Sequence, residues 1–355
     1  MSKIRLGFVG CGFNGQIAFI QNFNKNKNCE LTGLAEARGK LLKKVSKKYK
    51  IKNQYLSHHK LIKDINKFDA VVIVTKRNMT PAIAYDFLKQ GKPVMTEKPM
   101  ASNLLQAKKL LRLSKKKKVL YKIGYNKIYD QGIEKAKKIF DNFLKKKILG
   151  KLIFIKSHRL SGSGYSSKNS YIETKEKNFL NKPRWDSTPK WLPKKHTKNY
   201  TKFLNLYCHN INLLKYFTNK KPKVLFSNLS DKKMSTVFFD YGNYSAVLET
   251  GFFTKEGWDE TFEIYFEKGH IKVILPPQHC KNISSKVLVY ENKKNKITKK
   301  YSFNSWSFKR QSDGFLKDIK KKKILQNSAK QAVEDIEIVE KIWKKFIKND
   351  IRKNN

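Results

Sequence analysis

The stretch KIRLGFVGCGFNG, residues 3–15, decides the fold of the first third of this 355-residue chain. Its first half is short and apolar, as expected of a buried strand, and the glycine turn that follows leads into QIAFIQNF, which suits a helix. Gly10, Gly12 and Gly15 have the GxGxxG spacing. The first glycine permits the turn, the second lets backbone approach a pyrophosphate, and the third lets helix pack on strand. We therefore expect a dinucleotide-binding unit.

A second apolar strand, CELTGLAEA (residues 29–37), contains an acid at its end. Glu36 lies 21 positions after Gly15, close to the offset of roughly 20 residues expected for the carboxylate that binds the adenosine ribose. A carboxylate there accepts hydrogen bonds from the 2′-hydroxyl and repels a 2′-phosphate, which favours NAD. Arg38 leaves NADP as an alternative, because a guanidinium beside the ribose can bind the extra phosphate. Another interpretation is that Glu36 only opens the next helix.

Strands and helices alternate through the rest of this region. The expected strands are FDAVVIVT (68–75), PVMTEK (93–98) and VLYKIGY (119–125), and the expected helices are MTPAIAYDFLKQG (79–91) and NLLQAKKLLRLSKKK (103–117). The first of these strands is continuously apolar, which is typical of a strand buried on both faces of a parallel sheet. The order predicts a doubly wound α/β unit, an amino-terminal Rossmann domain over residues 1–123.

From residue 151 the pattern changes to short strands joined by polar turns, with DYGN (240–243) and EKGH (267–270) as hairpin connections. We expect an α+β carboxyl-terminal domain over residues 124–350 with a large open, mostly antiparallel sheet. Its closing helix, at about 329–347, has Val333, Ile336, Val339, Trp343 and Phe346 on one stripe. A long insertion with little periodicity, residues 161–196, carries Arg184 and Trp185, which could bind substrate or anchor the loop.

Composition excludes several other classes of protein. The net charge is +50, but it comes from 70 Lys and only 8 Arg, whereas nucleic-acid readout favours the guanidinium fork. We therefore attribute the charge to compositional bias, and nucleic-acid binding through the lysine surface is the less favoured alternative. The four cysteines form no CxxC pair, so no metal site is expected, and no apolar run is long enough for a membrane helix. These features predict a soluble cytoplasmic protein.

With GFVGCGFNG, AVVIVT and above all TEKPMA (96–101) in this order, the chain resembles the Gfo/Idh/MocA oxidoreductases, the family of glucose-fructose oxidoreductase and inositol 2-dehydrogenase. The resemblance continues through residues 124–140 and 149–157 to the helix around LNLYCHNINLL (204–214), and so covers most of the chain. It implies an NAD(P)-dependent dehydrogenase that acts on a CH–OH group in carbohydrate metabolism. The expected substrate is a sugar, cyclitol or nucleotide sugar, and family members commonly pair through the second-domain sheet, which implies a homo-oligomer.

The resemblance also implies roles for individual residues. In family members the lysine that matches Lys98 contacts substrate, and the glutamate that matches Glu97 lies by the nicotinamide ribose. His209 matches a catalytic or substrate-binding histidine, although a lone histidine in an apolar helix can equally be a core group. Many members carry acids where this chain has Asn205 and Asn212. His209 should therefore be a weaker base here, and a cofactor-binding sensor with little or no catalysis is the alternative function.

The full set of candidates follows from the motif and the resemblance together. The catalytic candidates are Lys98 and His209. The cofactor-binding candidates are Gly10, Gly12, Phe13, Asn14, Gly15, Glu36, Arg38, Thr75, Asn78, Glu97 and Lys98. The substrate-binding candidates are Tyr125, Asn126, Arg184, Trp185, Asn205 and Asn212. The chain departs from the family pattern after Thr75, where Lys76 and Thr80 stand at positions that often hold proline and histidine. The substrate, the redox direction and the oligomeric state are left open.

Overall fold

A computed structural model describes residues 2–162, 171–176, 184–229, 234–252, 257–281, 283–292, 296–301 and 303–354. The chain forms two compact units, each assembled from three separate segments. Unit 1 comprises residues 1–125, 168–205 and 308–336, and unit 2 comprises residues 126–167, 206–307 and 337–355. The predicted domain boundary at residue 123 remains a prediction. The two units are not divided at a single point of the chain, because residues 168–205 and 308–336 also belong to unit 1.

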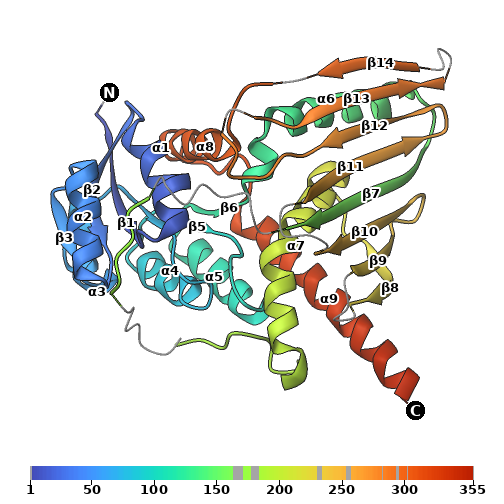
Figure 1. The fold of residues 1–355 in the computed structure, drawn as a ribbon. Coiled ribbons are helices and arrows are strands. Elements are labelled where there is room, and N and C mark those ends of the chain that lie inside the picture. The colour runs from blue at the N-terminus through green and yellow to red at the C-terminus, as the bar shows by residue number, and fades with distance from the viewer. Residues whose placement is uncertain are drawn as a thin grey trace. The chain divides into compact units, whose positions relative to one another are not determined.

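Unit 1 is built on a six-stranded parallel sheet in the order β3-β2-β1-β4-β5-β6 (Figure 1). The strands are β1 (Ile4–Val9), β2 (Cys29–Ala35), β3 (Asn53–Tyr55), β4 (Ala70–Ile73), β5 (Val94–Glu97) and β6 (Tyr121–Gly124). All four residues of β4 are buried, as its unbroken apolar sequence predicts. The strand order reverses between β1 and β4, and ligands of doubly wound sheets bind at the carboxyl ends of the strands at such a point. The Rossmann architecture is confirmed.

Helices fill the connections of this sheet. They are η1 (Gly15–Ile20), a π-helical turn that continues into α1 (Gln21–Asn24), then α2 (Gly39–Tyr49), α3 (His58–Lys63), η2 (Ile65–Lys67), α4 (Thr80–Lys89) and α5 (Leu104–Lys116). Local side chains explain where two of them begin. Ser57 Oγ accepts from Lys60 N at the start of α3, and Asn103 Oδ1 accepts from Gln106 N at the start of α5. Helices α4 and α5 lie side by side in Figure 1.

The carboxyl-terminal part of the chain completes unit 1. Helix α8 (Ser307–Lys321) contributes Asp318, which forms a fully buried ion pair with Lys122 of β6. Ile123 N donates to Asn327 O over 2.9 Å, and Asn327 Nδ2 donates to Tyr125 O over 2.7 Å. The last strand of the parallel sheet is thus held by residues about 200 positions away.

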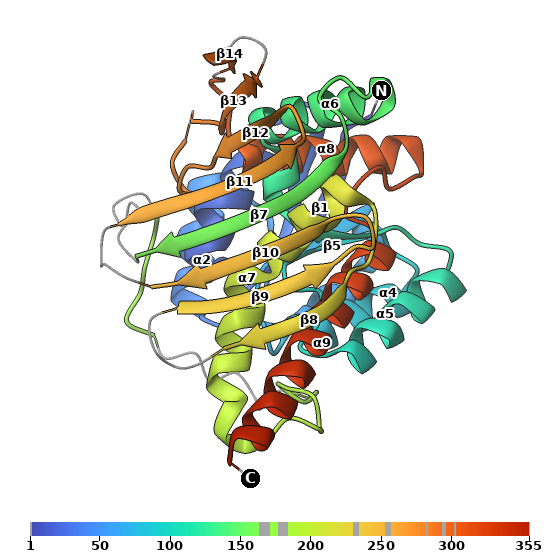
Figure 2. The same ribbon diagram turned by 90° about the vertical axis from the view of Figure 1, so that its right-hand side faces the viewer.

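Unit 2 is built on an eight-stranded sheet in the order β14-β13-β12-β11-β7-β10-β9-β8 (Figure 2). The strands are β7 (Leu152–Ser161), β8 (Lys223–Asn228), β9 (Met234–Asp240), β10 (Ser245–Gly251), β11 (Trp258–Phe266), β12 (Gly269–Ile274), β13 (Lys286–Glu291) and β14 (Lys296–Tyr301). Neighbouring strands are antiparallel except β7 and β10, which are parallel. The mostly antiparallel sheet is confirmed, and both predicted hairpin connections are present.

The remaining helices are η3 (Asn126–Tyr129), α6 (Gln131–Lys146), η5 (Lys194–His196), α7 (Thr197–Thr218) and α9 (Ala329–Asn354). The closing helix α9 begins where expected and continues beyond residue 347 to Asn354. Four of its five predicted stripe residues, Val333, Ile336, Val339 and Trp343, are buried. In the part of the chain that the structure describes, no helix combines the length and apolarity needed to cross a bilayer.

Candidate functional site

The glycine turn between β1 and η1 is too crowded for side chains at two of its three glycines. Gly10 has a φ of +91°, and a Cβ there would lie 2.3 Å from Val74 O. A Cβ on Gly15 would lie 2.5 Å from Gly10 O. At Gly12 the nearest atom to such a Cβ is Arg38 Nη2, at 3.7 Å. The backbone at Gly12 is therefore open to a close ligand, which fits the approach of a pyrophosphate.

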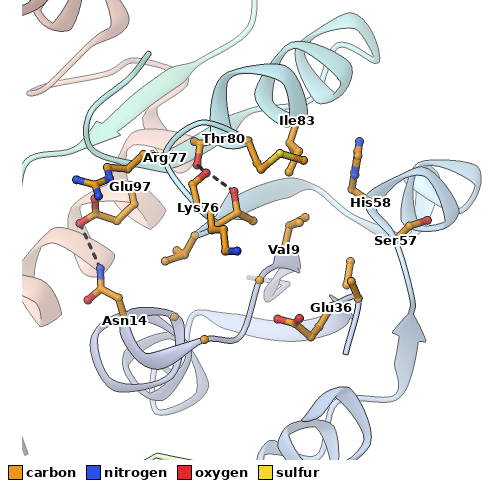
Figure 3. A pocket seen from close by; sticks show the side chains of 18 of the residues that line it. Val9, Asn14, Glu36, Ser57, His58, Lys76, Arg77, Thr80, Ile83 and Glu97 are labelled. Carbon is orange, nitrogen blue, oxygen red and sulfur yellow. Dashed lines mark hydrogen bonds between the residues drawn. The ribbon is translucent and has the colours of Figure 1, made fainter. Parts of the chain in front are cut away.

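A cavity of about 760 Å³ opens above this turn, entirely within unit 1. A volume of this order suits a cofactor, since ligand sites commonly measure about 300 to 1,000 Å³. Figure 3 shows Asn14 and Glu97 at one end of the cavity and Glu36, Ser57 and His58 at the other. Of the cofactor-binding candidates, all except Asn78 line the cavity: Gly10, Gly12, Phe13, Asn14, Gly15, Glu36, Arg38, Thr75, Glu97 and Lys98.

Glu36 is buried directly after β2 and accepts five hydrogen bonds. Cys11 donates from N over 3.1 Å and from Sγ over 3.7 Å, and Arg38 donates from its backbone N over 3.2 Å, from Nε over 2.9 Å and from Nη2 over 3.1 Å. Burial alone would raise the pKa of Glu36, but the Arg38 guanidinium and the backbone N–H groups of Cys11 and Arg38 together more than offset it, and the pKa is lowered. Glu36 is therefore an ionised acceptor, as binding of a ribose hydroxyl requires. The positive charge of Arg38 is thus already paired with the Glu36 carboxylate.

Glu97 and Asn14 meet at the opposite end of the cavity. Asn14 Nδ2 donates to Glu97 Oε1 over 3.3 Å. Desolvation raises the pKa of Glu97 to about 6, while Lys98 and Asn14 act in the opposite direction. Glu97 thus changes charge close to neutral pH, which is a property found frequently at functional sites.

Lys98 also lines the cavity and reaches toward α7. Its Nζ donates to Asn205 O over 3.0 Å and to Asn205 Oδ1 over 3.2 Å, and the peptide bond between Lys98 and Pro99 is cis. The ammonium carries three N–H donors, so it can hold a substrate oxygen in addition to protein acceptors. One helical turn after Asn205, the same helix carries His209.

The loop after β4 is held by two threonines. Thr75 Oγ1 and Thr80 Oγ1 are 2.9 Å apart, and Lys76 O accepts from Thr80 N over 3.1 Å. The contact between the two hydroxyl groups gives Thr80 a structural role, at a position where the family that the chain resembles often has histidine. Lys76 and Arg77 line the cavity.

The insertion between β7 and α7 contributes a segment that we call the strap, defined by residues 171–176 and 184–196. Arg184 Nη2 donates to Asp86 Oδ2 over 2.6 Å and to Ala82 O over 2.9 Å. Trp185 packs edge-on against Tyr85, with ring centroids 5.5 Å apart. The strap is therefore anchored to α4. Of its two substrate-binding candidates, Arg184 lines the cavity, while Trp185 contacts the helix.

Sequence reasoning missed a polar cluster at the rim of this cavity. His58 Nε2 lies 3.0 Å from Asp86 Oδ2, and the His58 and His59 rings lie with centroids 3.9 Å apart and planes tilted by 38°. Two imidazoles and a carboxylate could ligate a divalent metal, although Arg184 already pairs with Asp86. The 28 positions between His58 and Asp86 carry no sequence signal for this contact.

Three substrate-binding candidates outside the cavity, Tyr125, Asn126 and Asn212, are buried. Tyr125 is 1% exposed, and Asn126 Nδ2 donates to Ser307 Oγ over 2.8 Å. On α7, His209 is 2% exposed and Asn212 is 5% exposed. Because Asn205, His209 and Asn212 follow an i, i+4, i+7 spacing, they share one face of α7.

The sequence analysis also missed a buried pair of charged side chains in unit 2. Lys127 pairs with Glu260, and Asn210 Nδ2 donates to Ser157 Oγ over 3.2 Å. Burial lowers the pKa of Lys127 to about 8, against the opposing effect of Glu260. Nothing in the local sequence distinguishes Lys127 from the other lysines of this lysine-rich chain.

Comparison with known proteins agrees with this geometry. Residues 4–125 match the model of an oxidoreductase family described as having an NAD-binding Rossmann fold. Over 139 residues the chain is 27% identical to the myo-inositol 2-dehydrogenase of Thermotoga maritima. That match covers 39% of this chain and 41% of the relative, so it spans about two fifths of the length of that curated protein.

Solved structures resemble the chain over nearly its whole length. One is KijD10, a 3-ketoreductase from Actinomadura kijaniata in complex with NADP and TDP-benzene, at 13% identity and a TM-score of 0.73 over 97% of this chain and 98% of that one. Another is an aldose-aldose oxidoreductase from Caulobacter crescentus complexed with glycerol, at 14% identity and a TM-score of 0.74 over 98% of each chain.

A third is an oxidoreductase from Agrobacterium radiobacter in complex with NAD+, L-tartaric acid and magnesium, at 14% identity and a TM-score of 0.71 over 98% of this chain and 97% of that one. At such identities these likenesses show the fold. The resemblance seen in the sequence is thereby confirmed: residues 4–125 match the model of the Gfo/Idh/MocA oxidoreductases, a family described as having an NAD-binding Rossmann fold.

Proposed function

We propose that the protein is a nicotinamide-dependent dehydrogenase that transfers a hydride between NAD(P) and a secondary alcohol or ketone of a sugar, cyclitol or nucleotide sugar. The observation that carries the proposal is a single cavity lined by the glycine turn, by the ionised Glu36 and by Lys98. It combines a place for the dinucleotide with a cation suited to an alcohol or carbonyl oxygen. When bound, NAD supplies the hydride acceptor or donor.

In this proposal Lys98 holds the reacting oxygen of the substrate and stabilises negative charge on it. His209 accepts the hydroxyl proton during oxidation and returns it during reduction. Glu97 binds the nicotinamide ribose, and Asn205 helps to hold the Lys98 ammonium, which it contacts over 3.0 and 3.2 Å. Tyr125, Asn126, Arg184, Trp185 and Asn212 are assigned to substrate binding.

The test is an assay of the purified protein with NAD+ against a panel of polyols and sugars, followed by absorbance of the reduced nicotinamide. Myo-inositol is the first choice, because the relative from Thermotoga maritima is a myo-inositol 2-dehydrogenase. Turnover that depends on Lys98 and His209 is the expected result. No turnover in either direction, on any member of the panel, would contradict the proposal.

A cofactor-binding sensor of the same fold is the second candidate function. It is favoured by one observation, the amides of Asn205 and Asn212 on the face of α7 that carries His209. An amide can orient an imidazole but cannot stabilise imidazolium as a carboxylate does. Tight binding of NADH by calorimetry, combined with absence of turnover on the whole panel, would support the sensor.

We further propose that the protein forms a homo-oligomer through the unit 2 sheet. Strands β8 and β9 expose four large apolar side chains: Leu225, Phe226, Met234 and Phe238. The Phe226 and Phe238 rings lie together on neighbouring strands, with centroids 6.2 Å apart. An exposed cluster of this kind commonly marks a protein interface. A cytoplasmic location and the absence of a nucleic-acid partner also remain proposals, to be tested by fractionation and by binding assays at physiological salt.

A further inference from the structure

We propose that Glu176, in the strap, is a specificity-determining residue that selects NAD over NADP, because its carboxylate lies where the 2′-phosphate of NADP would bind. The inference rests on the proposed role of the cavity as a dinucleotide site. It concerns a residue for which neither the glycine motif nor the family resemblance provides a role.

Glu176 contacts the first turn of α2 directly. Lys40 N donates to its Oε1 over 2.9 Å, and Leu41 N donates to its Oε2 over 3.0 Å. Thr174 Oγ1 donates to Oε2 over 3.1 Å and so orients the same carboxylate. A helix amino terminus attracts anions through its free N–H groups and its dipole. In this protein two of those N–H groups already donate to a side chain.

The first turn of α2 adjoins the place expected for the adenosine ribose. Glu36, at the end of β2, is the acceptor for the 2′-hydroxyl, and Arg38 is the residue that directly precedes α2. A phosphate on that hydroxyl cannot overlap Glu36, so it must extend past it toward Arg38 and the amino end of α2. Glu176 lies at that end, on the N–H groups of Lys40 and Leu41.

The charges near Arg38 also disfavour a phosphate. Arg38 is the cation that would receive a 2′-phosphate, and hydrogen bonding to Glu36 is the largest cause of its raised pKa, with a smaller contribution from Glu176. Two carboxylates therefore face one guanidinium. Hydrogen bonds from Lys40 N and Leu41 N lower the pKa of Glu176, so that it is ionised at neutral pH. A doubly charged phosphate would be repelled by the Glu176 carboxylate beside Arg38, although Lys40 is a further cation near Glu176.

The strap holds Glu176 in this position through contacts with the glycine turn. Tyr171 packs edge-on against Phe13, with ring centroids 5.0 Å apart. Gln16 Nε2 donates to Ile172 O over 2.8 Å, and Ile172 N donates to Gln16 Oε1 over 2.9 Å. Residues 171–176 therefore run from the helix after the glycine turn to α2, along the two elements that would bind the adenosine half of the cofactor.

The experiment is a titration of the whole protein with NADH and with NADPH, followed by nicotinamide fluorescence, in wild type, Glu176→Gln and the control Glu30→Gln. Glu30 is exposed at the opposite end of β2, so its substitution removes the same charge away from the site. We expect wild type to prefer NADH. Glu176→Gln should bind NADPH about tenfold more tightly, which corresponds to removal of one nearby charge repulsion, and should bind NADH almost unchanged. Glu30→Gln should retain the wild-type ratio.

Three results would overturn the inference. The first is equal affinity of wild type for NADH and NADPH. The second is an unchanged affinity ratio in Glu176→Gln together with a lower melting temperature, which would make Glu176 only a cap of α2. The third, binding of neither nucleotide to folded wild type, would contradict the proposed function itself, whereas the first two leave that function intact.

Discussion

Lys98 and Glu97 are adjacent in sequence but have different chemical roles in the proposed site. Lys98 offers a charge that protein acceptors hold in place, whereas Glu97 offers a carboxyl group whose ionisation changes near neutral pH. Both are located by the strand end and the following proline, a local feature that is visible in the sequence. Their surroundings are not, because Asn14 and Asn205 lie 83 and 107 positions from their respective partners.

Replacing Lys98 by alanine should lower turnover by about 10² to 10³-fold, the cost typical of removing one group that stabilises charge on a reacting oxygen. The affinity for NADH should change much less. Steady-state kinetics and fluorescence titration measure the two effects separately. Lys115→Ala, at an exposed position on α5, is the matched control. Undiminished turnover of Lys98→Ala would contradict the catalytic role of Lys98.

The pKa of about 6 for Glu97 predicts a pH dependence of cofactor binding. Ribose hydroxyls donate to the ionised carboxylate, and protonation removes that acceptor. The affinity for NAD+ should therefore be constant above pH 7 and should weaken as the pH falls through 6. Glu97→Gln, which cannot ionise, should bind less tightly at pH 7 and lack this slope. Calorimetric titrations between pH 5 and 8 test the prediction, and an identical slope in the variant would assign it to another group.

At the scale of elements, the helices and strands of unit 1 follow from the sequence better than the segments that join them do. Apolar strands, the glycine turn and helix-compatible segments are local signals, and they predict β1, β4, α4 and α5 well. The strap has no periodicity, so its contacts with Gln16, Asp86 and Tyr85 depend on long-range packing that no local pattern encodes. Glu176 and His58 were missed for this reason.

The buried ion pair between Lys122 of β6 and Asp318 of α8 predicts an asymmetric response to mutation. Asp318→Leu leaves a buried ammonium without its carboxylate and should reduce stability by about 3 to 5 kcal/mol. Lys122→Met combined with Asp318→Leu should be less damaging than Asp318→Leu alone, because neither charge then remains. Urea denaturation of the three proteins measures the difference. The control is Lys67→Met, in the exposed pair with Asp64, which should shift the urea midpoint far less. If the losses of stability from the two buried substitutions simply add, the coupling between Lys122 and Asp318 is refuted.

At the scale of the whole molecule, the net charge opposes the self-association that we propose. The charge of +50 makes like copies repel, while the apolar side chains on β8 and β9 favour association. Sedimentation at physiological salt should give a mass above the 41.6 kDa of one chain. Phe238→Asp should shift the protein to a monomer, and Leu105→Asp, at a position 69% exposed on α5, should not. A monomeric wild type would exclude the proposed interface.

The way unit 1 is completed has a consequence for how the protein is made. Besides the Lys122 pair, Phe19 packs against Phe308 with ring centroids 5.7 Å apart, and Asn26 Nδ2 donates to Asp313 Oδ1 over 2.6 Å. A ribosome must therefore synthesise most of the chain before the sheet that emerges first can acquire its final contacts. Expression of residues 1–125 alone should yield a poorly soluble fragment, and fusion of residues 308–336 to it is the simplest remedy to try. In this chain the nucleotide-binding fold begins at the amino terminus but is among the last parts to be finished.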